Sequence, residues 1–179
     1  MKIKLFTYLK NTDLHCMSSY EAITNLLGYK KMKRIKRYGL WELELDTATT
    51  EAAIQKVEYI ISSSYYISNP NKEAHYIEKV PQPVLRAGEQ NILVKVDTPY
   101  IINEEQLIKK IAQKVGIKLK SISKSLIWEL VIANNGSKDN LKDELAQKVL
   151  NTQNRANGLL VNPIHETYSF LEPESYYSK

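Results

Sequence analysis

Apolar and polar residues follow two different periods along the first half of the chain. Over residues 3–9 apolar side chains stand at every second position, which predicts a half-buried strand; over 20–27 they recur three or four positions apart, which predicts an amphipathic helix. Ser18 or Ser19 is predicted to cap this helix. The strand over 3–9 and the helix over 20–27 are followed by a strand through Ile35, a turn at Tyr38-Gly39 and a strand over 40–45. A helix over 53–60 and a strand over 74–78 complete the first half. The expected order is therefore β-α-β-β-α-β.

The second half of the chain repeats this pattern. Trp41 and Trp128, the two tryptophans of the sequence, lie 87 residues apart within matching Trp-Glu-Leu segments. A motif of Asn-Pro with Glu three residues after the Pro occurs at 69–73 and again at 162–166, and we call it the Asn-Pro motif. A collinear series of such matches indicates a duplicated structural unit. The elements expected in the second copy are a strand over 92–96, a helix over 107–115 that starts near Asn103, strands through Ile122 and over 128–132, a helix over 141–149 and a strand over 167–171.

The order of elements in each copy predicts an α+β fold of two ferredoxin-like repeats. The expected boundaries are 1–79 for the first repeat, 80–90 for a Pro-containing linker, 91–172 for the second repeat and 173–179 for a tail. A unit of about eighty residues buries only about 60% of its chain surface, and a sheet with both helices on one face leaves the other face bare. We therefore predict that the repeats pack sheet to sheet as a covalent pseudo-dimer.

Composition narrows the class of protein. Hydrophobic residues make up 43% and charged residues 25% of the 179 positions, as in ordinary globular proteins. No apolar run is long enough to span a bilayer, and the amino terminus lacks the apolar core of a signal peptide. The single cysteine, Cys16, excludes an internal disulfide framework. A cytoplasmic protein that does not associate with membranes is the expectation.

Several short motifs occur in the order found in one known family. Leu27-Gly28-Tyr29 follows the first helix, Arg37-Tyr38-Gly39 precedes the strand segment Leu40-Trp41-Glu42-Leu43-Glu44-Leu45, and the second copy ends with Asn162-Pro163-Ile164-His165-Glu166-Thr167-Tyr168. Both copies resemble the PurS family, the small subunit of bacterial and archaeal phosphoribosylformylglycinamidine synthase. The chain departs from the family by fusing two copies, by carrying His75 in place of the last Tyr of the motif, and by having Ser125-Leu126 where the first copy has Tyr38-Gly39.

The resemblance implies a non-catalytic bridging subunit of a ligase in purine biosynthesis. In the family's complex a glutaminase subunit releases ammonia, and an ATP-dependent synthetase uses it to convert formylglycinamide ribonucleotide to the amidine. The resemblance implies that this chain binds both of those subunits and no cofactor, with ATP and Mg on the synthetase; further self-association of the chain stays open. The partner-interface residues that it implies are Arg37, Tyr38, Gly39, Asn69, Pro70, Asn162, Pro163 and Glu166.

Alternative functions rest on weaker features. His15 beside Cys16 suggests a nucleophile, but sequence neighbours seldom form a base–nucleophile pair, and the second copy repeats no other triad member. A lone repeated Glu, as at 73 and 166, more often bonds locally than acts in acid–base chemistry. The run Lys30–Arg37, with six basic residues of eight in a chain of net charge +5, suggests nucleic-acid binding. The acidic residues at 42 and 44 on the inner strand disfavour it.

A further alternative is an amino-acid-binding regulatory protein, because paired ferredoxin-like domains also bind amino acids at their interface. Such domains usually carry a Gly-rich loop after the first strand, and neither "KNTDLHCMSS" nor "TPYIINEE" contains glycine. For Trp41 and Trp128 we predict burial in the core between the sheets rather than exposure as anchors for a partner.

Overall fold

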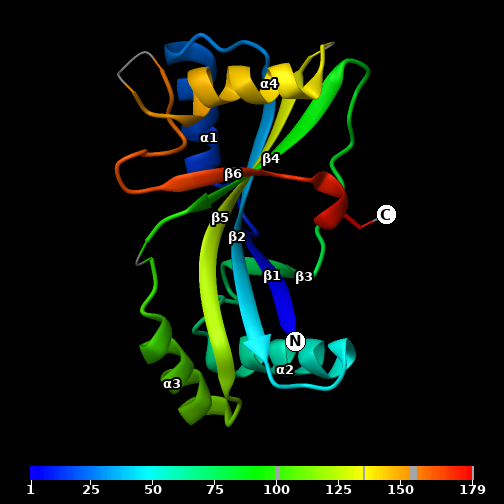
Figure 1. The fold of residues 1–179 in the computed structure, drawn as a ribbon, viewed down its shortest axis with the longest axis vertical. Helices are drawn as coiled ribbons and strands as arrows, with labels where there is room; N and C mark the ends of the chain where they lie inside the picture. Colours follow the sequence, from blue (N-terminus) through cyan, green and yellow to red (C-terminus); the bar gives the residue numbers. More distant parts are fainter. Residues whose placement is uncertain (100, 135, 154–156, 179) are drawn as a thin grey trace.

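The computed structural model describes residues 1–99, 101–134, 136–153 and 157–178 and has an α+β fold (Figure 1). Its elements are β1 (Lys2–Leu9), α1 (Leu14–Glu21), β2 (Met32–Leu45), α2 (Thr50–Ser64), β3 (Glu73–Ile77), β4 (Glu89–Asp97), α3 (Glu104–Val115), β5 (Leu119–Ala133), α4 (Lys138–Leu145) and β6 (Thr167–Leu171). Single π-helical turns, Ala22–Leu26 and Ala146–Leu150, continue α1 and α4. Within the described ranges, no helix has both the length and the apolar character needed to cross a bilayer.

The six strands form one open antiparallel sheet in the order β3-β1-β2-β5-β4-β6. The two long central strands, β2 and β5, pair from Met32 opposite Ile132 to Leu45 opposite Leu119. Gly39 of β2 lies opposite Leu126 of β5. Leu126 is also the residue of the second repeat that is equivalent to Gly39, because the two positions are 87 residues apart, as the two tryptophans are. A pseudo-two-fold axis therefore passes between Gly39 and Leu126, and the repeats join edge to edge.

Two predictions about this sheet are wrong. The repeats share one sheet instead of packing two sheets face to face, and the hairpin at Tyr38-Gly39 does not form. A two-residue hairpin needs positive φ, and Gly39 is not among the residues with positive φ. Each repeat contributes β-α-β-α-β in place of β-α-β-β-α-β, so a ferredoxin-like repeat is not confirmed.

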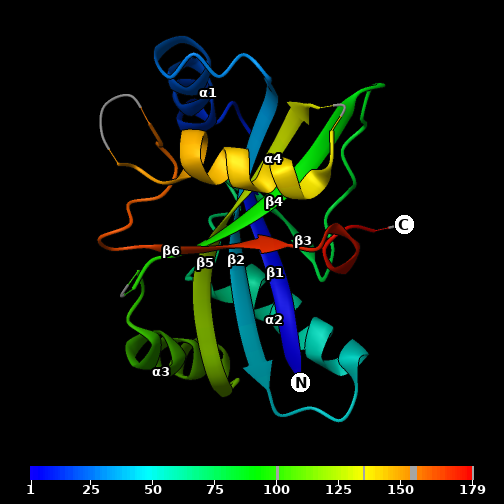
Figure 2. The same cartoon turned by 45° about the horizontal axis from the view of Figure 1, so that its top comes forward.

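The length of the central strands decides where the helices lie. The 14 residues of β2 span roughly 45 Å in extended conformation. The strand therefore carries the chain from one end of the sheet to the other. Figures 1 and 2 show α1 with α4 at one end and α2 with α3 at the opposite end. The first helix of each repeat is thus placed beside the second helix of the other repeat.

Two main clusters form the hydrophobic core on the helix-covered side of the sheet, and each combines both repeats. One cluster places Ile23, after α1, with Val94 of β4 and Leu145 of α4. The other places Ile111 of α3 with Leu5 of β1 and Val57 of α2. Burying the apolar side of either first helix therefore requires residues of the other repeat. The repeat boundaries at 79, 90 and 172 stay a prediction.

Burial of the two tryptophans is confirmed, with exposed fractions of 3% for Trp41 and 4% for Trp128. Their surroundings differ from the expected ones. Because the strands of the described residues form one sheet, each indole packs in one of the two mixed clusters instead of between sheets. Each tryptophan thus contributes to the packing between the two repeats.

The helix starts are partly as predicted. Asn103 caps α3, since its side chain accepts a hydrogen bond from the backbone N–H of Gln106 at 3.0 Å. The cap of α1 is Asp13, five residues before Ser18 and six before Ser19, and its carboxylate accepts from the N–H groups of His15 and Cys16. A carboxylate at this position also favours the positive end of the helix dipole.

The linker and the tail cover part of the sheet face opposite the helices. Val80 of the linker and Tyr177 of the tail join a third cluster that includes Tyr38 of β2. The backbones of the two segments also bond: Val80 N donates to Tyr176 O at 2.8 Å, and Ser178 N donates to Val80 O at 3.0 Å. The predicted tail is therefore part of the fold; its last residue, Lys179, lies outside the described residues.

Candidate functional site

The Asn-Pro motif forms the same turn in both repeats. The backbone N–H of Asn69 donates to Glu73 Oε2 at 2.7 Å, and that of Asn162 donates to Glu166 Oε2 at 2.8 Å. Each Asn side chain also accepts from the N–H two residues further on, at 3.0 and 3.1 Å. This is an Asx turn closed by a carboxylate. The expectation that both glutamates bond locally is confirmed.

The two turns flank a groove that crosses the pseudo-two-fold axis, which we call the axial groove. It encloses about 450 Å³, with Gly39 and Leu126 near its centre. Hollows of about 410 and 720 Å³ adjoin it at the starts of α1 and α3. The residues that line the axial groove are Thr7, Tyr8, Leu9, Asp13, Arg37, Gly39, Glu73, Thr98, Ile101, Lys124, Ser125, Leu126 and Glu166.

Equivalent positions of the two repeats supply the cations of the groove. Arg37 and Lys124 are related by the 87-residue offset. Arg37 Nε donates to Asp13 Oδ2 at 2.7 Å, whereas Lys124 Nζ lies 4.6 Å from the centre of the Trp41 ring, where the ring quadrupole attracts it. Burial raises the pKa of the Asp13 carboxyl, but hydrogen bonds from Arg37 and from the Cys16 N–H outweigh this and bring it below its usual value.

Gly39 allows the strands to approach closely at the centre of the groove. A Cβ at this position would lie 2.8 Å from Thr7 Oγ1 on β1, well inside the contact distance of about 3.5 Å between such atoms. The glycine is therefore required by crowding against the neighbouring strand, and not by a turn.

The predicted interface residues are only partly brought together. Arg37, Gly39 and Glu166 line the axial groove, and the exposed residues Asn69, Asn162 and Pro163 lie in the turns beside it. Pro70 lines a different hollow, and Tyr38 is buried on the opposite face of the sheet. Sequence reasoning missed Asp13 and Lys124; the offset from Arg37 was the signal that could have identified Lys124.

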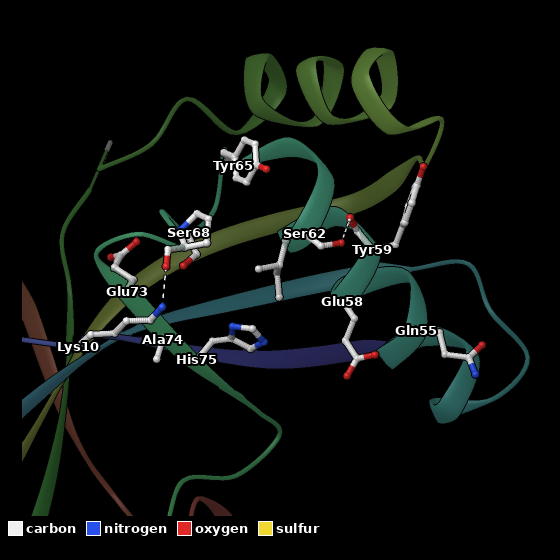
Figure 3. A pocket seen from close by; sticks show the side chains of 12 residues that line it. Lys10, Gln55, Glu58, Tyr59, Ser62, Tyr65, Ser68, Glu73, Ala74 and His75 are labelled. Carbon is white, nitrogen blue, oxygen red and sulfur yellow. Dashed lines mark hydrogen bonds between the residues drawn. The ribbon is translucent and has the colours of Figure 1, made fainter.

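Another hollow, of about 900 Å³, lies between α2 and the edge strand β3. Figure 3 shows Glu58 and Tyr59 projecting from α2, with Lys10 and His75 on the strand side. Lys10 Nζ donates to the carbonyl oxygen of Pro70 at 2.6 Å and so supports the turn. Glu73 lines both this hollow and the axial groove, so the first turn separates two concave surfaces.

The basic run is largely engaged in contacts within the fold. Lys31 pairs with Glu144 at 2.8 Å, Arg34 with Glu89 at 3.0 Å and Arg37 with Asp13 at 2.7 Å. The first two pairs connect β2 and the residue just before it to elements of the second half of the chain. Solvent-exposed pairs of this kind contribute little stability each, but they reduce the positive charge that a nucleic acid would meet.

Cys16 and His15 point to different environments. Cys16 packs in the cluster around α4, whereas His15 is exposed. Burial, together with the nearby Asp13 carboxylate, raises the pKa of the Cys16 thiol to about 12. Because the thiolate is the nucleophilic form, this shift disfavours Cys16 as a nucleophile at neutral pH. Among the residues that the structure describes, no three His, Cys, Asp or Glu side chains are grouped so as to hold a metal ion.

Comparison with known proteins identified no relative: no family model, no curated protein and no solved structure matches the chain. Its function is therefore inferred from its residues and their geometry.

Proposed function

We propose that the chain is a non-catalytic bridging subunit of phosphoribosylformylglycinamidine synthase, which docks the glutaminase onto the ATP-dependent synthetase. The observation that carries the proposal is the axial groove. There, residues of the two motifs that resemble the PurS family, the Arg37–Gly39 segment and the Asn-Pro motif, lie around one concave surface although they are distant in sequence. Both motifs can therefore contact a partner at the same docking surface.

The two sides of the groove differ in a way that suits two different partners. In the second turn, Ile164 is 81% exposed, whereas the equivalent residue of the first turn, 93 positions earlier, is the polar Asn71. An exposed apolar side chain on a turn fixed by hydrogen bonds loses little entropy on docking, and such residues are effective anchors. We assign Ile164 as the anchor for one of the two subunits.

The fold itself supports a fused pair of PurS-like units. We propose that each end of the sheet is a ferredoxin-like unit that has exchanged parts with its neighbour: four antiparallel strand segments with two helices, of which the first helix and one strand segment come from the other repeat. Fusion through the linker makes this exchange intramolecular, which raises the effective concentration of the partner segments.

Bridging has a physical benefit for the reaction. Ammonia released at one active site is consumed at another, and holding the two sites together replaces a bimolecular encounter. A docked path also keeps the intermediate from solvent. In this proposal ATP and Mg bind to the synthetase partner and not to this chain.

The test is the mass of the assembly by light scattering. The chain is measured alone and mixed with its cognate glutaminase and synthetase, glutamine and ATP. A species that contains all three supports the proposal, and a chain that stays alone refutes it. Ile164→Asp is expected to weaken assembly by about tenfold or more with no change in melting temperature. Val84→Asp is the matched control, because Val84 is an equally apolar linker residue that is 80% exposed.

A further inference from the structure

A separate pocket lies on the sheet face opposite the helices. Linker residues 81–84 arch over β2 and β5 and enclose about 310 Å³, which we call the linker pocket. Lys36 and Glu129, directly opposite each other in the β2–β5 register, both line it. Tyr38 and Tyr76 supply aromatic walls. A cavity of this size and mixed lining is at the small end of ligand sites.

The roof of the linker pocket is held in place from several sides. Arg34 donates to the carbonyl oxygen of Val84 at 2.5 Å and pairs with Glu89 at 3.0 Å. Val80, just before the roof, bonds to the tail. Prolines at 81 and 83 fix the backbone φ of the segment. The pocket is therefore formed before any ligand arrives.

Glu129 is a charged group that the fold leaves incompletely bonded. Its side chain is buried, with 3% exposed, and its Oε2 accepts from the Tyr177 hydroxyl at 2.8 Å. Tyr177 in turn accepts from the Asn91 side-chain amide. Within the described part of the chain, no hydrogen bond reaches the other carboxylate oxygen of Glu129, and this oxygen is not among the fully buried atoms that lack a partner, so it keeps contact with solvent. A buried carboxylate with one neutral donor is costly, and burial raises its pKa.

Lys36 is the complementary group. It is exposed and forms no ion pair with the residues that the structure describes. Directly opposite residues of antiparallel strands have Cβ atoms about 5 Å apart. A carboxylate with a single neutral donor and an ammonium group without an ion pair among the described residues therefore lie opposite each other on adjacent strands, at the same pocket.

We propose that the linker pocket binds a free α-amino acid, with its ammonium group on Glu129, its carboxylate on Lys36 and its side chain against the tyrosine and proline walls. A simple cation would meet the positive charges of Arg34 and Lys36, and a simple anion would meet Glu129. A zwitterion satisfies both charges at once. This inference is independent of the bridging role.

Isothermal titration calorimetry of the full chain at neutral pH tests the site, with L-phenylalanine, L-leucine and L-glutamine as probes. Millimolar or tighter binding is expected for at least one of them. For that amino acid, the N-acetyl derivative lacks the ammonium group and the methyl ester lacks the carboxylate. Each should bind about tenfold or more weakly, because each loses one charge-assisted contact.

Two variants give different signatures. Glu129→Gln should weaken the binding of the free amino acid and of its methyl ester alike. Lys36→Gln should weaken the binding of the free amino acid and leave the binding of the ester unchanged. Lys33→Gln, a neighbouring exposed lysine that does not line the pocket, should bind as the parent does. Gln at 129 can still accept from Tyr177, and circular dichroism checks that the variant is folded.

Two results overturn the proposal. One is the absence of binding for all three amino acids at about 10 mM, where a millimolar site is nearly saturated. The other is binding that survives both Glu129→Gln and Lys36→Gln. Neither result bears on assembly with the glutaminase and synthetase, which light scattering measures separately.

Discussion

Gly39→Ala tests the crowding at the pseudo-two-fold axis. The added methyl carbon would lie 2.8 Å from Thr7 Oγ1 and 3.8 Å from Lys124 Cε. Lysine can move its flexible end, but Thr7 is 4% exposed on a paired strand, and its branched side chain has few rotamers. The strands must therefore separate locally. Overpacking of this kind costs about 1–3 kcal/mol, and Ala recovers about 0.5–1 kcal/mol over Gly in a strand. The difference between these two terms is a net loss of about 0–2.5 kcal/mol, with a middle value of about 1 kcal/mol.

Urea unfolding monitored by tryptophan fluorescence measures this loss, because both indoles are buried in the folded protein. Thr7→Ala removes the obstructing oxygen, so the double variant should recover most of the cost. The coupling between the two substitutions is then expected to be about 1–2 kcal/mol of restored stability. If the two effects instead add to within about 0.5 kcal/mol, crowding by Thr7 is not the reason for the glycine.

Three further predictions concern the core and Glu129. Trp128→Ala should lower the free energy of unfolding by about 3–5 kcal/mol; unchanged urea unfolding with lost partner binding would contradict its core role. Segments 1–79 and 91–179, expressed apart, should each lack stable structure by circular dichroism and fold on mixing, because both main clusters draw on both segments. Burial raises the pKa of Glu129 above 4.5, so the folded state holds that proton more tightly than the unfolded state does. The stability gained from this tighter proton binding is fully present below pH 4.5 and is lost as the pH rises through the raised pKa of Glu129. Glu129→Gln should therefore reduce the fall of the urea midpoint over this pH range.

Local features of the fold could be predicted from the sequence because short-range chemistry determines them. The last strands, at 73–77 and 167–171, lie within a residue of their expected bounds. Gly28 and Gly116 follow helical segments and have positive φ, a conformation that glycine adopts without strain. The Asn-Pro motif closes the same hydrogen bonds in both copies, since every partner lies within four residues.

The sheet arrangement could not be predicted in this way, because it depends on partners far away in sequence. Tyr38-Gly39 has the composition of a hairpin turn, and only the proximity of Thr7 explains the glycine otherwise. The second copy carried the contrary signal: Ser125-Leu126 at the same position has no glycine, which a two-residue hairpin turn favours. The candidate groove follows from this arrangement, since Arg37 and Lys124 come together only when the two long strands pair across the axis.

Fusion explains why the two halves could become different. In a pair of identical chains, every residue at the axis meets its own copy and every side of the groove is the same. In the fused chain Gly39 meets Leu126. At the 87-residue offset, Glu42 pairs with Lys95 at 3.7 Å in a half-buried setting, whereas its counterpart Glu129 is buried under the linker. Each of these differences requires independent mutation of the two copies. Under the proposed bridging function, one part of the chain meets a glutaminase and another meets a synthetase, and independent mutation of the two copies lets each part adapt to its own partner.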